Sequence, residues 1–418
     1  MKRLLLSMAA VPLMVGSLSV SASADDGINI LNDVKIKGEI RPRFETAQVS
    51  DNQKDRANAF TARTHLVVSA GLLGIDNLTA TIGLQSVNNF GYANYNSTNN
   101  GKTDYDVIKD PNFAMLSEAS IDYTVDKTAL HVGRSQINLD NQRFIGTVGW
   151  RQVERSYDTV YAANSSVKNL NLLAAYVYGF QGVGASPTTN SNSVLLHAKY
   201  KVMDELSITA YDYMLAVGAQ GVDSDTYGVA LTGKVNVGAK LSYRAEYAVQ
   251  KDPTMELGPT NLTADADYYN LDLGANISGI LAGVNYEVLS GTDGTDGKTT
   301  FNPALGTNHK FNGWADVFYV ANKPVGGLKD ANVRLGYKAK GFGKVLAVYH
   351  DFTADKDMAS ATGVTDDLGS EIDVVYVNAI PGVKNLKGLV KYASYSKGDA
   401  TGYTNDKTVG WVQLDYKF

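Results

Sequence analysis

The chain contains no cysteine among its 418 residues. This absence excludes disulfide bonds, thiolate chemistry and metal sites with cysteine ligands. Histidine is scarce, and its five copies stand in separate segments without a nucleophile motif or a paired-histidine motif beside them. They are His65, His131, His197, His309 and His350. We therefore expect no enzymatic activity.

An excess of positive charge is also missing. The chain has 38 lysines and arginines against 43 aspartates and glutamates, a formal net charge of −5. Binding to nucleic acid depends on clustered lysine and arginine side chains that contact phosphates. We therefore expect no nucleic acid as a partner.

Long apolar runs are absent except at the N-terminus. Residues 1–24 carry two cations, an apolar stretch and the small residues Ala22 and Ala24, which together predict a cleaved secretory signal peptide. The remaining residues, 25–418, are expected to form a single domain. No later apolar run approaches the roughly eighteen residues that a membrane helix requires. This test does not detect the strands of membrane barrels, because their hydropathy alternates.

Alternation with a period of two runs through the whole chain. In the segment KIKGEIRPRFETA, residues 35–47, charged side chains occupy every second position and mostly apolar residues stand between them. Similar alternation recurs near 60–70, 116–125, 193–201, 240–249, 268–273 and 332–338. This period is typical of β-strands with one apolar and one hydrated face.

The connections between these segments alternate between short and long. Short turns are expected near 72–76, 125–127, 166–169, 202–205, 278–279 and 340–343. Long polar loops are expected near 47–56, 88–113, 136–155, 181–191, 251–266, 291–330 and 353–368. Barrels of the bacterial outer membrane have short periplasmic turns and longer outer loops, whereas a soluble β-sandwich has no reason to keep this phase.

The last strand, GWVQLDYKF, ends in the aromatic Phe418 and resembles the assembly signal of outer-membrane barrels. Twenty-five tyrosines would suit interfacial aromatic girdles. We therefore predict an all-β, antiparallel, up-and-down transmembrane β-barrel in the bacterial outer membrane, in contact with lipid and lipopolysaccharide.

The pattern predicts eighteen strands, with sixteen as the alternative if two weak hairpins fail. Residues 315–330 could add a nineteenth strand, but two periplasmic termini require an even number, so we assign this segment to an outer loop. Pro42 cannot donate a hydrogen bond to a ladder, which predicts a bulge there or a position beyond the membrane band. Barrels of sixteen to eighteen strands enclose an aqueous channel.

One loop differs from the others. Residues 133–155 carry arginines, large aromatic residues and three glycines, a composition suited to a loop that folds inward and sets the aperture. The alternative is an ordinary solvated loop. The candidate constriction residues of this loop are Arg134, Arg143 and Arg151.

Charged residues of the adjacent strands are candidates for the wall of the pore. Arg41, Arg43 and Arg63 should stand side by side as a basic ladder. Rings of charge set ion preference in pores, so such a ladder would steer anions. A counter-wall of carboxylates is expected from Glu39, Glu45, Glu118 and Asp122. The alternative is mutual neutralisation of these charges with little selectivity.

Three stretches carry a family resemblance. GEIRPRFE near the start, DNQRFIG…GWRQ between 140 and 152, and AVYHDF at 347–352 resemble the alginate-export type of outer-membrane barrel and the related major porins of ε-proteobacteria. The resemblance implies an eighteen-stranded barrel with an infolded loop whose arginines match Arg134, Arg143 and Arg151. It also implies a homotrimer. Alginate exporters use a strongly electropositive conduit, and the acidic residues expected in this lumen depart from that pattern.

Two aspartate-rich loops are candidates for calcium binding. They contain Asp104 and Asp106, with Asp110 nearby, and Asp293 and Asp296. Oxygen-rich loops can hold Ca²⁺, but neither loop fits the twelve-residue EF-hand spacing, and solvated loops are the alternative. No other cofactor is expected.

Together these patterns predict a porin, a passive channel for ions and small hydrophilic solutes. Two other functions stay open: a substrate-specific channel or exporter for organic or polysaccharide anions, and an abundant surface barrel with a structural or adhesive role. Conductance of the purified protein would separate the channels from the surface barrel.

Overall fold

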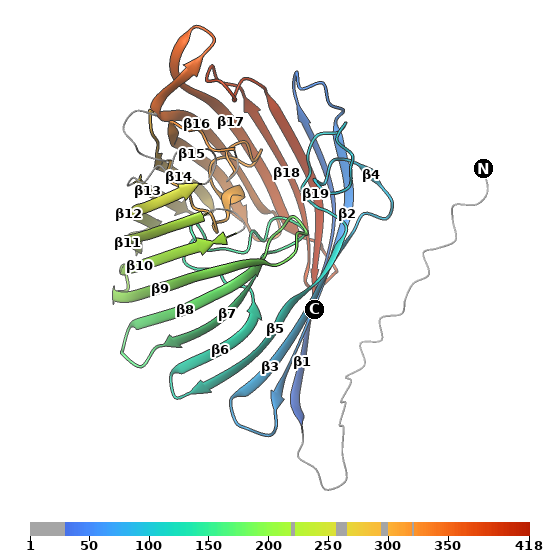
Figure 1. Cartoon of the computed structure of the whole chain (residues 1–418), viewed down its shortest axis with the longest axis vertical. Coiled ribbons are helices and arrows are strands. Elements are labelled where there is room, and N and C mark those ends of the chain that lie inside the picture. Colours follow the sequence, from blue (N-terminus) through green and yellow to red (C-terminus); the bar gives the residue numbers. More distant parts are fainter. Residues whose placement is uncertain (1–29, 219–221, 256–265, 294–299, 320–321) are drawn as a thin grey trace, which may run out of the picture.

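The computed structural model describes residues 30–218, 222–255, 266–293, 300–319 and 322–418, and these form one β-barrel (Figure 1). Among them, no helix is long and apolar enough to cross a membrane. The expected signal peptide at residues 1–24 lies outside the described residues. The first nine wall strands are β1 (Leu31–Val49), β2 (Ala57–Leu72), β3 (Leu78–Asn88), β5 (Phe113–Val125), β6 (Thr128–Ser135), β7 (Ser156–Asn164), β8 (Leu170–Gln181), β9 (Thr189–Met203) and β10 (Leu206–Val217).

The second half of the wall continues in chain order. Its strands are β11 (Val222–Asn236), β12 (Lys240–Met255), β13 (Ala266–Ile277), β14 (Ile280–Ser290), β15 (Gly327–Ala339), β16 (Gly343–Ser360), β17 (Gly363–Ala379), β18 (Leu386–Ser396) and β19 (Lys407–Lys417). A two-residue strand, β4 (Ala93–Asn94), pairs with β2 in an outer loop, and η2 (Asn308–Lys310) is a single 3₁₀ turn. The prediction of eighteen wall strands is confirmed, and the alternative of sixteen is wrong.

Each wall strand pairs antiparallel with its neighbours in sequence, and β1 pairs with β19 to close the ring. Closure matters because an unpaired strand edge would leave backbone N–H and C=O groups without partners in hydrocarbon. In the closed barrel the backbone N–H and C=O groups of the strands are hydrogen-bonded without a second layer of structure. It is an outer-membrane barrel of the up-and-down type.

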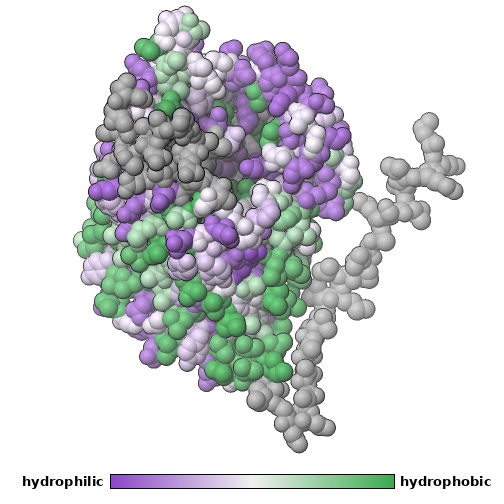
Figure 2. Space-filling model, in the orientation of Figure 1, coloured by the Kyte–Doolittle hydropathy of each residue, from purple (hydrophilic) through white to green (hydrophobic). Residues whose placement is uncertain are grey.

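Alternation along the strands separates the two faces. On β1, Arg41, Arg43 and Glu45 are buried inside, while Ile36 and Phe44 are exposed on the outer face. Figure 2 shows the outer apolar residues gathered over the lower part of the molecule, with hydrophilic residues above them. The outer face thus matches lipid, and the inner face carries the charge.

The predicted short turns are confirmed, and strand direction places them all at one end of the barrel, the short-turn end. The long connections lie at the other end. One of these predictions is wrong: residues 353–368 are mostly strand, because β16 and β17 extend as a hairpin far above the wall. The assignment of residues 315–330 to a loop holds as far as Gly327, where β15 begins.

The bulge expected at Pro42 is not present. Pairing between β1 and β2 runs through Pro42 and Ala62 without a register shift, and the irregularity lies instead between Asn32 and Lys35. On the other side, the ladder to β19 skips from Ile40 to Arg43, so the missing N–H of the proline falls in a gap of that ladder. The other expectation, that Pro42 lies beyond the membrane band, stays a prediction.

Candidate functional site

Residues 136–155, between β6 and β7, fold into the barrel and form the first inward segment. The side chain of Gln152 is completely buried and donates to Thr61 Oγ1 (2.9 Å) and to the backbone oxygen of Arg41 (3.2 Å). The backbone oxygen of Trp150 accepts from Arg43 at 2.6 Å. These bonds dock the segment on the inner face of β1 and β2, so its position inside the barrel agrees with the sequence prediction.

A second segment, residues 300–319 between β14 and β15, also folds inward. Figure 1 shows η2, which belongs to it, within the ring of strands. Backbone bonds join the two inward segments: Gly146 N donates to Leu305 O (3.0 Å), and Thr307 N donates to Gln142 O (2.9 Å). The expectation of an ordinary outer loop here is therefore wrong.

A cluster of aromatic side chains around Phe144 holds the inward segments against the wall. The ring of Phe144 lies 5.8 Å from that of Phe301 in the second segment. It also lies 5.4 Å from the ring of Tyr211 and 5.1 Å from that of Tyr268, on β10 and β13. All four side chains are buried, so apolar burial holds both segments against the wall strands β10 to β13.

The predicted arginines of β1 and β2 do lie close together, but each meets a carboxylate. Arg41 Nη2 is 2.7 Å from Glu39 Oε1, and Arg63 Nη1 is 2.5 Å from Glu154 Oε1 in the first segment. Arg43 donates to Gln413 Oε1 at 2.7 and 2.9 Å. Its Nη1 also lies near Asp110 (3.5 Å) and Glu45 (3.7 Å).

Arg151 ties several loops into this network. Its guanidinium lies 3.2 Å from Glu45, 3.6 Å from Asp110 and 3.6 Å from Asp316. Burial lowers the pKa of Arg151, but the three carboxylates outweigh it and the pKa ends above its usual range. Glu39 and Glu45 are thus interleaved with the arginines and do not form a separate acidic wall.

Arg143 reaches the opposite side of the barrel. Its Nε and Nη2 lie 2.8 and 2.9 Å from the two carboxylate oxygens of Glu287 on β14, and Nη2 donates to Asn312 at 2.8 Å. The guanidinium carbon stands 4.8 Å from the ring centroid of Phe311. The hydrogen bond from Nη2 to Glu287 is strengthened because both groups are ionised and buried. Arg143 joins both inward segments to the wall.

The three other predicted residues lie outside this network, and only Glu118 approaches it, through His65, whose Nδ1 is 3.2 Å from Arg63 Nη2. Arg134 is a cross-strand partner of Asp158 and bonds it at 2.6 and 2.8 Å, so it belongs to the wall between β6 and β7. Glu118 is 3.5 Å from His65, and Asp122 is 2.6 Å from His131. Their roles in selectivity stay predictions.

An aromatic cage, which the sequence did not reveal, surrounds Lys391 of β18. Lys391 Nζ stands 4.0 Å from the ring centroid of Trp150, 3.9 Å from that of Trp314 and 5.1 Å from that of Trp411. These three indoles are all the tryptophans of the chain. A desolvated ammonium over indole faces is worth about 2 kcal/mol or more. Because the indoles come from both inward segments and from β19, the cage connects all three.

His309 completes this cage and is neutral. Its Nε2 accepts from Lys391 Nζ at 2.6 Å and its Nδ1 donates to Asp316 at 2.9 Å, a pattern that assigns the proton to Nδ1. The ring stacks on Trp150 at 4.7 Å. Burial lowers the pKa of His309 to about 3, helped by the positive charges of Lys391 and Arg151. Burial raises the pKa of Asp316, but His309, Arg151 and Lys407 outweigh it and the pKa ends well below its usual range.

Wall carboxylates hold the tip of the second segment through its backbone. Ala315 N donates to Glu371 Oε1 (2.7 Å), and Trp314 N donates to Asp373 Oδ2 (3.1 Å). Gly313 has a φ of +84°, and a Cβ placed on it would lie 2.4 Å from a carboxylate oxygen of Glu371. The positive φ favours glycine at this position, and a larger residue would also require the Glu371 carboxylate to shift. Pairing and burial therefore position the tip beside β17.

Two of the calcium candidates, Asp106 and Asp110, use their carboxylates in other contacts. Asp106 accepts from Val49 N (2.9 Å) and from Asn52 Nδ2 (2.5 Å), and Asp110 belongs to the arginine network. The backbone oxygen of Asp104 accepts from Asp55 N, Asp293 lies in a described loop, and Asp296 lies outside the described residues. Over the described part of the chain, no group of three or more histidines or carboxylates could hold a metal ion. Calcium binding stays a prediction.

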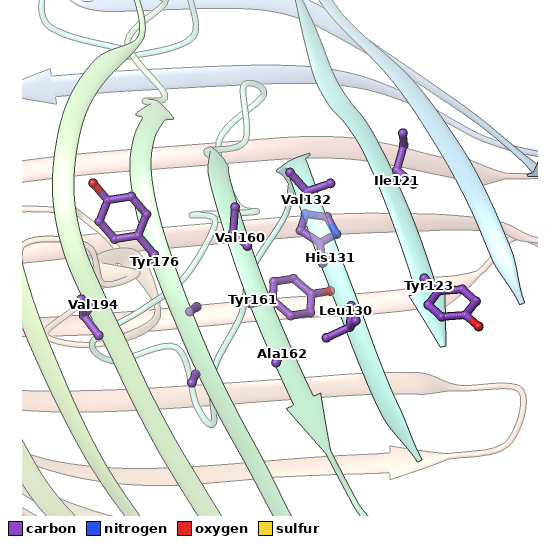
Figure 3. A pocket seen from close by; sticks show the side chains of 12 residues that line it. Ile121, Tyr123, Leu130, His131, Val132, Val160, Tyr161, Ala162, Tyr176 and Val194 are labelled. Carbon is purple, nitrogen blue, oxygen red and sulfur yellow. The ribbon is translucent and has the colours of Figure 1, made fainter. Parts of the chain in front are cut away.

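A depression on strands β5 to β9 lies away from these contacts (Figure 3). Its exposed residues include Val132, Val160 and Tyr176, so it opens on the outer apolar face of the barrel. His131 and Tyr161, which stack at 4.4 Å, form its floor from the inner side of the wall. The depression therefore belongs to the outer surface and not to the lumen.

Comparison with known proteins gives a family and a fold. The sequence model of the alginate export family matches residues 35–413. Solved structures with the same fold include Pseudomonas aeruginosa OpdO, with a TM-score of 0.70, 12% identity, and coverage of 93% of this chain and 98% of that one. Acinetobacter baumannii OccAB4 has a TM-score of 0.71 and 15% identity over 93% and 98% of the two chains. P. aeruginosa OpdK with vanillate has a TM-score of 0.69 and 12% identity over 93% and 99%. No curated protein matches the sequence.

Proposed function

The chain belongs to the alginate-export family, and we propose that it is a passive outer-membrane porin for ions and small hydrophilic solutes. The barrel excludes lipid and encloses a polar lumen, and the two inward segments reduce its width. No bond chemistry is required of it. The finer resemblance to ε-proteobacterial major porins remains a prediction.

One observation carries this proposal: two inward segments meet in the lumen and are anchored on opposite walls. Gln152 fixes the first segment to the side of the barrel formed by β1 and β2. The pair between Arg143 and Glu287 on β14 fixes it to the opposite side. A barrel built only as a surface scaffold has no need to organise its lumen in this way. A channel does, because the gap left beside such segments sets which solutes pass.

We propose that the charged residues predicted from the sequence act mainly by fixing this width. Arg41, Arg43, Arg63, Arg143 and Arg151 are paired with carboxylates, which favours the alternative of mutual neutralisation over a free basic ladder. Pairs of this kind hold loops in place but present little net charge to a passing ion. A homotrimer in contact with lipid and lipopolysaccharide is part of the proposal.

A substrate-specific channel for organic anions is the second candidate. The observation in its favour is the likeness to OpdK, whose structure contains vanillate, an organic carboxylate. Export of a polysaccharide, which the family's name describes, fits less well with a lumen where carboxylates accompany the arginines.

Single-channel recording tests the proposal directly. The detergent-purified protein is reconstituted in a planar bilayer, and current is recorded under a salt gradient. We expect conductance steps in multiples of three and a measurable reversal potential. A folded barrel that stays silent would contradict the porin and would favour the surface-structural alternative, whereas conductance blocked by micromolar vanillate would favour the specific channel.

A further inference from the structure

Lysines gather at the short-turn end of the barrel on positions that face the lumen. Ten such positions occur on eight strands: Lys35 and Lys37 (β1), Lys199 and Lys201 (β9), Lys234 (β11), Lys240 (β12), Lys338 (β15), Lys344 (β16), Lys387 (β18) and Lys417 (β19). Each stands an even number of residues from a buried inner residue of its own strand, as Lys387 does from Lys391 and Lys417 from Trp411. Since side chains alternate along a strand, all ten belong to the inner face. We call this set the lysine mouth.

Strand pairing brings members of the lysine mouth side by side. Lys338 and Lys344 are direct partners across β15 and β16. Following the wall from there, Lys387, Lys417 and then the lysines of β1 come in turn, with only β17 contributing none. Like charges placed directly opposite each other destabilise a strand pair, so the pair of Lys338 and Lys344 costs stability and is not explained by folding. Lys387 and Lys417 instead stand opposite the carboxylates of Asp415 and Glu39.

Lys387 stands opposite Asp415 on β19, but most of these lysines make no ion pair in the described residues. Ion pairs tie Lys417 to Glu39 (3.4 Å), Lys201 to Asp204 (2.5 Å) and Lys199 to Asp140 (3.9 Å). Within the described residues, the other seven members make no ion pair: Lys35, Lys37, Lys234, Lys240, Lys338, Lys344 and Lys387. Arg41, Arg43, Arg63, Arg143 and Arg151 differ, because each of them meets a carboxylate.

The short turns do not reverse this balance. The short turns contain the carboxylates Asp76, Asp126, Asp204 and Glu205, and the start of β1 adds Asp33. The same turns add four more lysines, Lys127, Lys168, Lys340 and Lys384. A chain with a net charge of −5 therefore gathers more lysines than carboxylates at this end of its lumen, even when Glu39 and Asp415 of the wall are counted.

We propose that the lysine mouth is a binding site for small multivalent anions, such as polycarboxylates or oligophosphates. The inference rests on the proposed function in so far as these anions would be solutes of the channel at its periplasmic end, where short turns lie. A single solvated ammonium attracts a unit charge by only about 1 kcal/mol at 4 Å, so a monovalent anion is held weakly. Several ammonium groups acting together favour a compact multivalent anion. The inward register points to free solutes and not to lipid headgroups.

Tripolyphosphate is the probe for the test. It is added to one chamber of a neutral-lipid bilayer holding the full-length protein, at about 0.1 M salt so that charges interact over roughly 10 Å. We expect block of the current from one side only. The triple variant Lys338→Gln, Lys344→Gln, Lys387→Gln should raise the half-blocking concentration at least about tenfold, because each glutamine removes one of the attracting charges in a solvated site.

A matched control removes the same amount of charge elsewhere. Lys54, Lys102 and Lys397 are exposed in long loops at the opposite end, and their change to glutamine should leave the block unaltered. Equal block from both sides, or equal block of both triple variants, would overturn the inference.

A binding measurement separates this inference from the porin itself. Calorimetric titration of tripolyphosphate into the detergent-solubilised protein, with both triple variants, does not depend on conductance. A silent bilayer with binding that the mouth variant loses would contradict the porin and support the site. Absence of binding would overturn the site, as would binding that only vesicles with anionic phospholipid show.

Discussion

At the scale of single residues, the charged side chains inside the barrel are mainly structural pairs. Arg43, Arg63 and Arg143 are almost fully buried, and each lies within bonding distance of a carboxylate or an amide oxygen. An unpaired charge in such surroundings would be costly, whereas a matched pair is tolerated. Removing one partner of such a pair should therefore displace an inward segment. Its effect on the net charge that a passing ion meets should be smaller.

Arg143→Ala tests this view. The change leaves the Glu287 carboxylate buried without its partner, and losses of this type amount to about 3–5 kcal/mol. We expect the inward segments to loosen and single-channel conductance to rise, with a smaller effect on ion preference. Adding Glu287→Gln should recover part of the original conductance, because it removes the orphaned charge.

Arg56 provides the matched control for Arg143. It is exposed in an outer loop, where its side chain donates to Gln48, so Arg56→Ala should leave conductance unchanged. Unchanged conductance in Arg143→Ala as well would remove this pair from the account of the aperture.

His309 gives the cage a pH dependence with a definite sign. Its pKa is lowered to about 3 in the fold, so the neutral form stabilises the folded arrangement. That stabilisation is complete above the ordinary histidine pKa of about 6.5 and is lost progressively as pH falls from there towards 3. The second segment should open more readily on acidification.

Tryptophan fluorescence reports this opening, because the only three tryptophans of the chain form the cage. We expect emission to shift to longer wavelength between about pH 6.5 and 3, because protonation of His309 weakens the folded arrangement over this range. In His309→Gln the part of the shift above about pH 5 should disappear. If both proteins give the same curve, another group controls the cage.

At the scale of elements, the two inward segments depend on each other. The first supplies Phe144 and Arg143, and the second supplies Phe301, Leu305 and the backbone that meets the wall carboxylates. Neither segment has regular secondary structure beyond the 3₁₀ turn, so neither could hold its position alone. Their fixed arrangement is a property of the closed barrel that contains them.

Gly313→Ala tests how tightly the second segment is held. A methyl group there would meet the Glu371 carboxylate at 2.4 Å, so either that carboxylate or the tip must shift, and the hydrogen bond from Ala315 N to Glu371 should weaken. We expect higher or noisier conductance and weaker protection of the Trp314 and Ala315 amides from hydrogen exchange.

Gly341→Ala is the control for Gly313→Ala. Gly341 has a similar φ of +80°, but a Cβ there meets nothing within 4 Å, so this variant carries only the cost of a left-handed backbone, about 1–2 kcal/mol. Equal effects of the two substitutions would show that backbone strain, and not the contact with Glu371, controls the tip.

At the scale of the whole molecule, the outer face of the barrel must match lipid over a limited height. Leu271 and Ile277 stand on the same face of β13, both about half exposed, with Leu271 mid-strand and Ile277 beside the short turn. Leu271→Arg should cost about 2–4 kcal/mol in a bilayer, and Ile277→Arg about 0–1 kcal/mol, because the cost depends on depth. Urea unfolding in lipid vesicles measures both values. Equal costs would contradict this placement of β13 in the membrane.

How much of this could be predicted from the sequence differs between wall and lumen. Alternation in segments such as 240–249 predicts strands because side chains at successive positions face lipid and water in turn. This pattern does not depend on which strands lie next to each other. The inward position of residues 136–155 was also predictable, from arginine and glycine content. The second segment was missed, although Phe301, Leu305, Trp314 and Phe318 in a loop expected to be polar were a usable signal.

The sequence by itself determined the strand pattern, the alternation of short and long connections and the closed eighteen-stranded barrel, because these follow from local periodicity and from the need to pair every backbone group. Only the tertiary structure decided which charge meets which. The partner of Arg143 lies 144 positions away at Glu287, and Lys391 meets indoles from three separate elements. Such pairs depend on how loops of irregular backbone settle inside a finished wall, and no local period in the sequence encodes that.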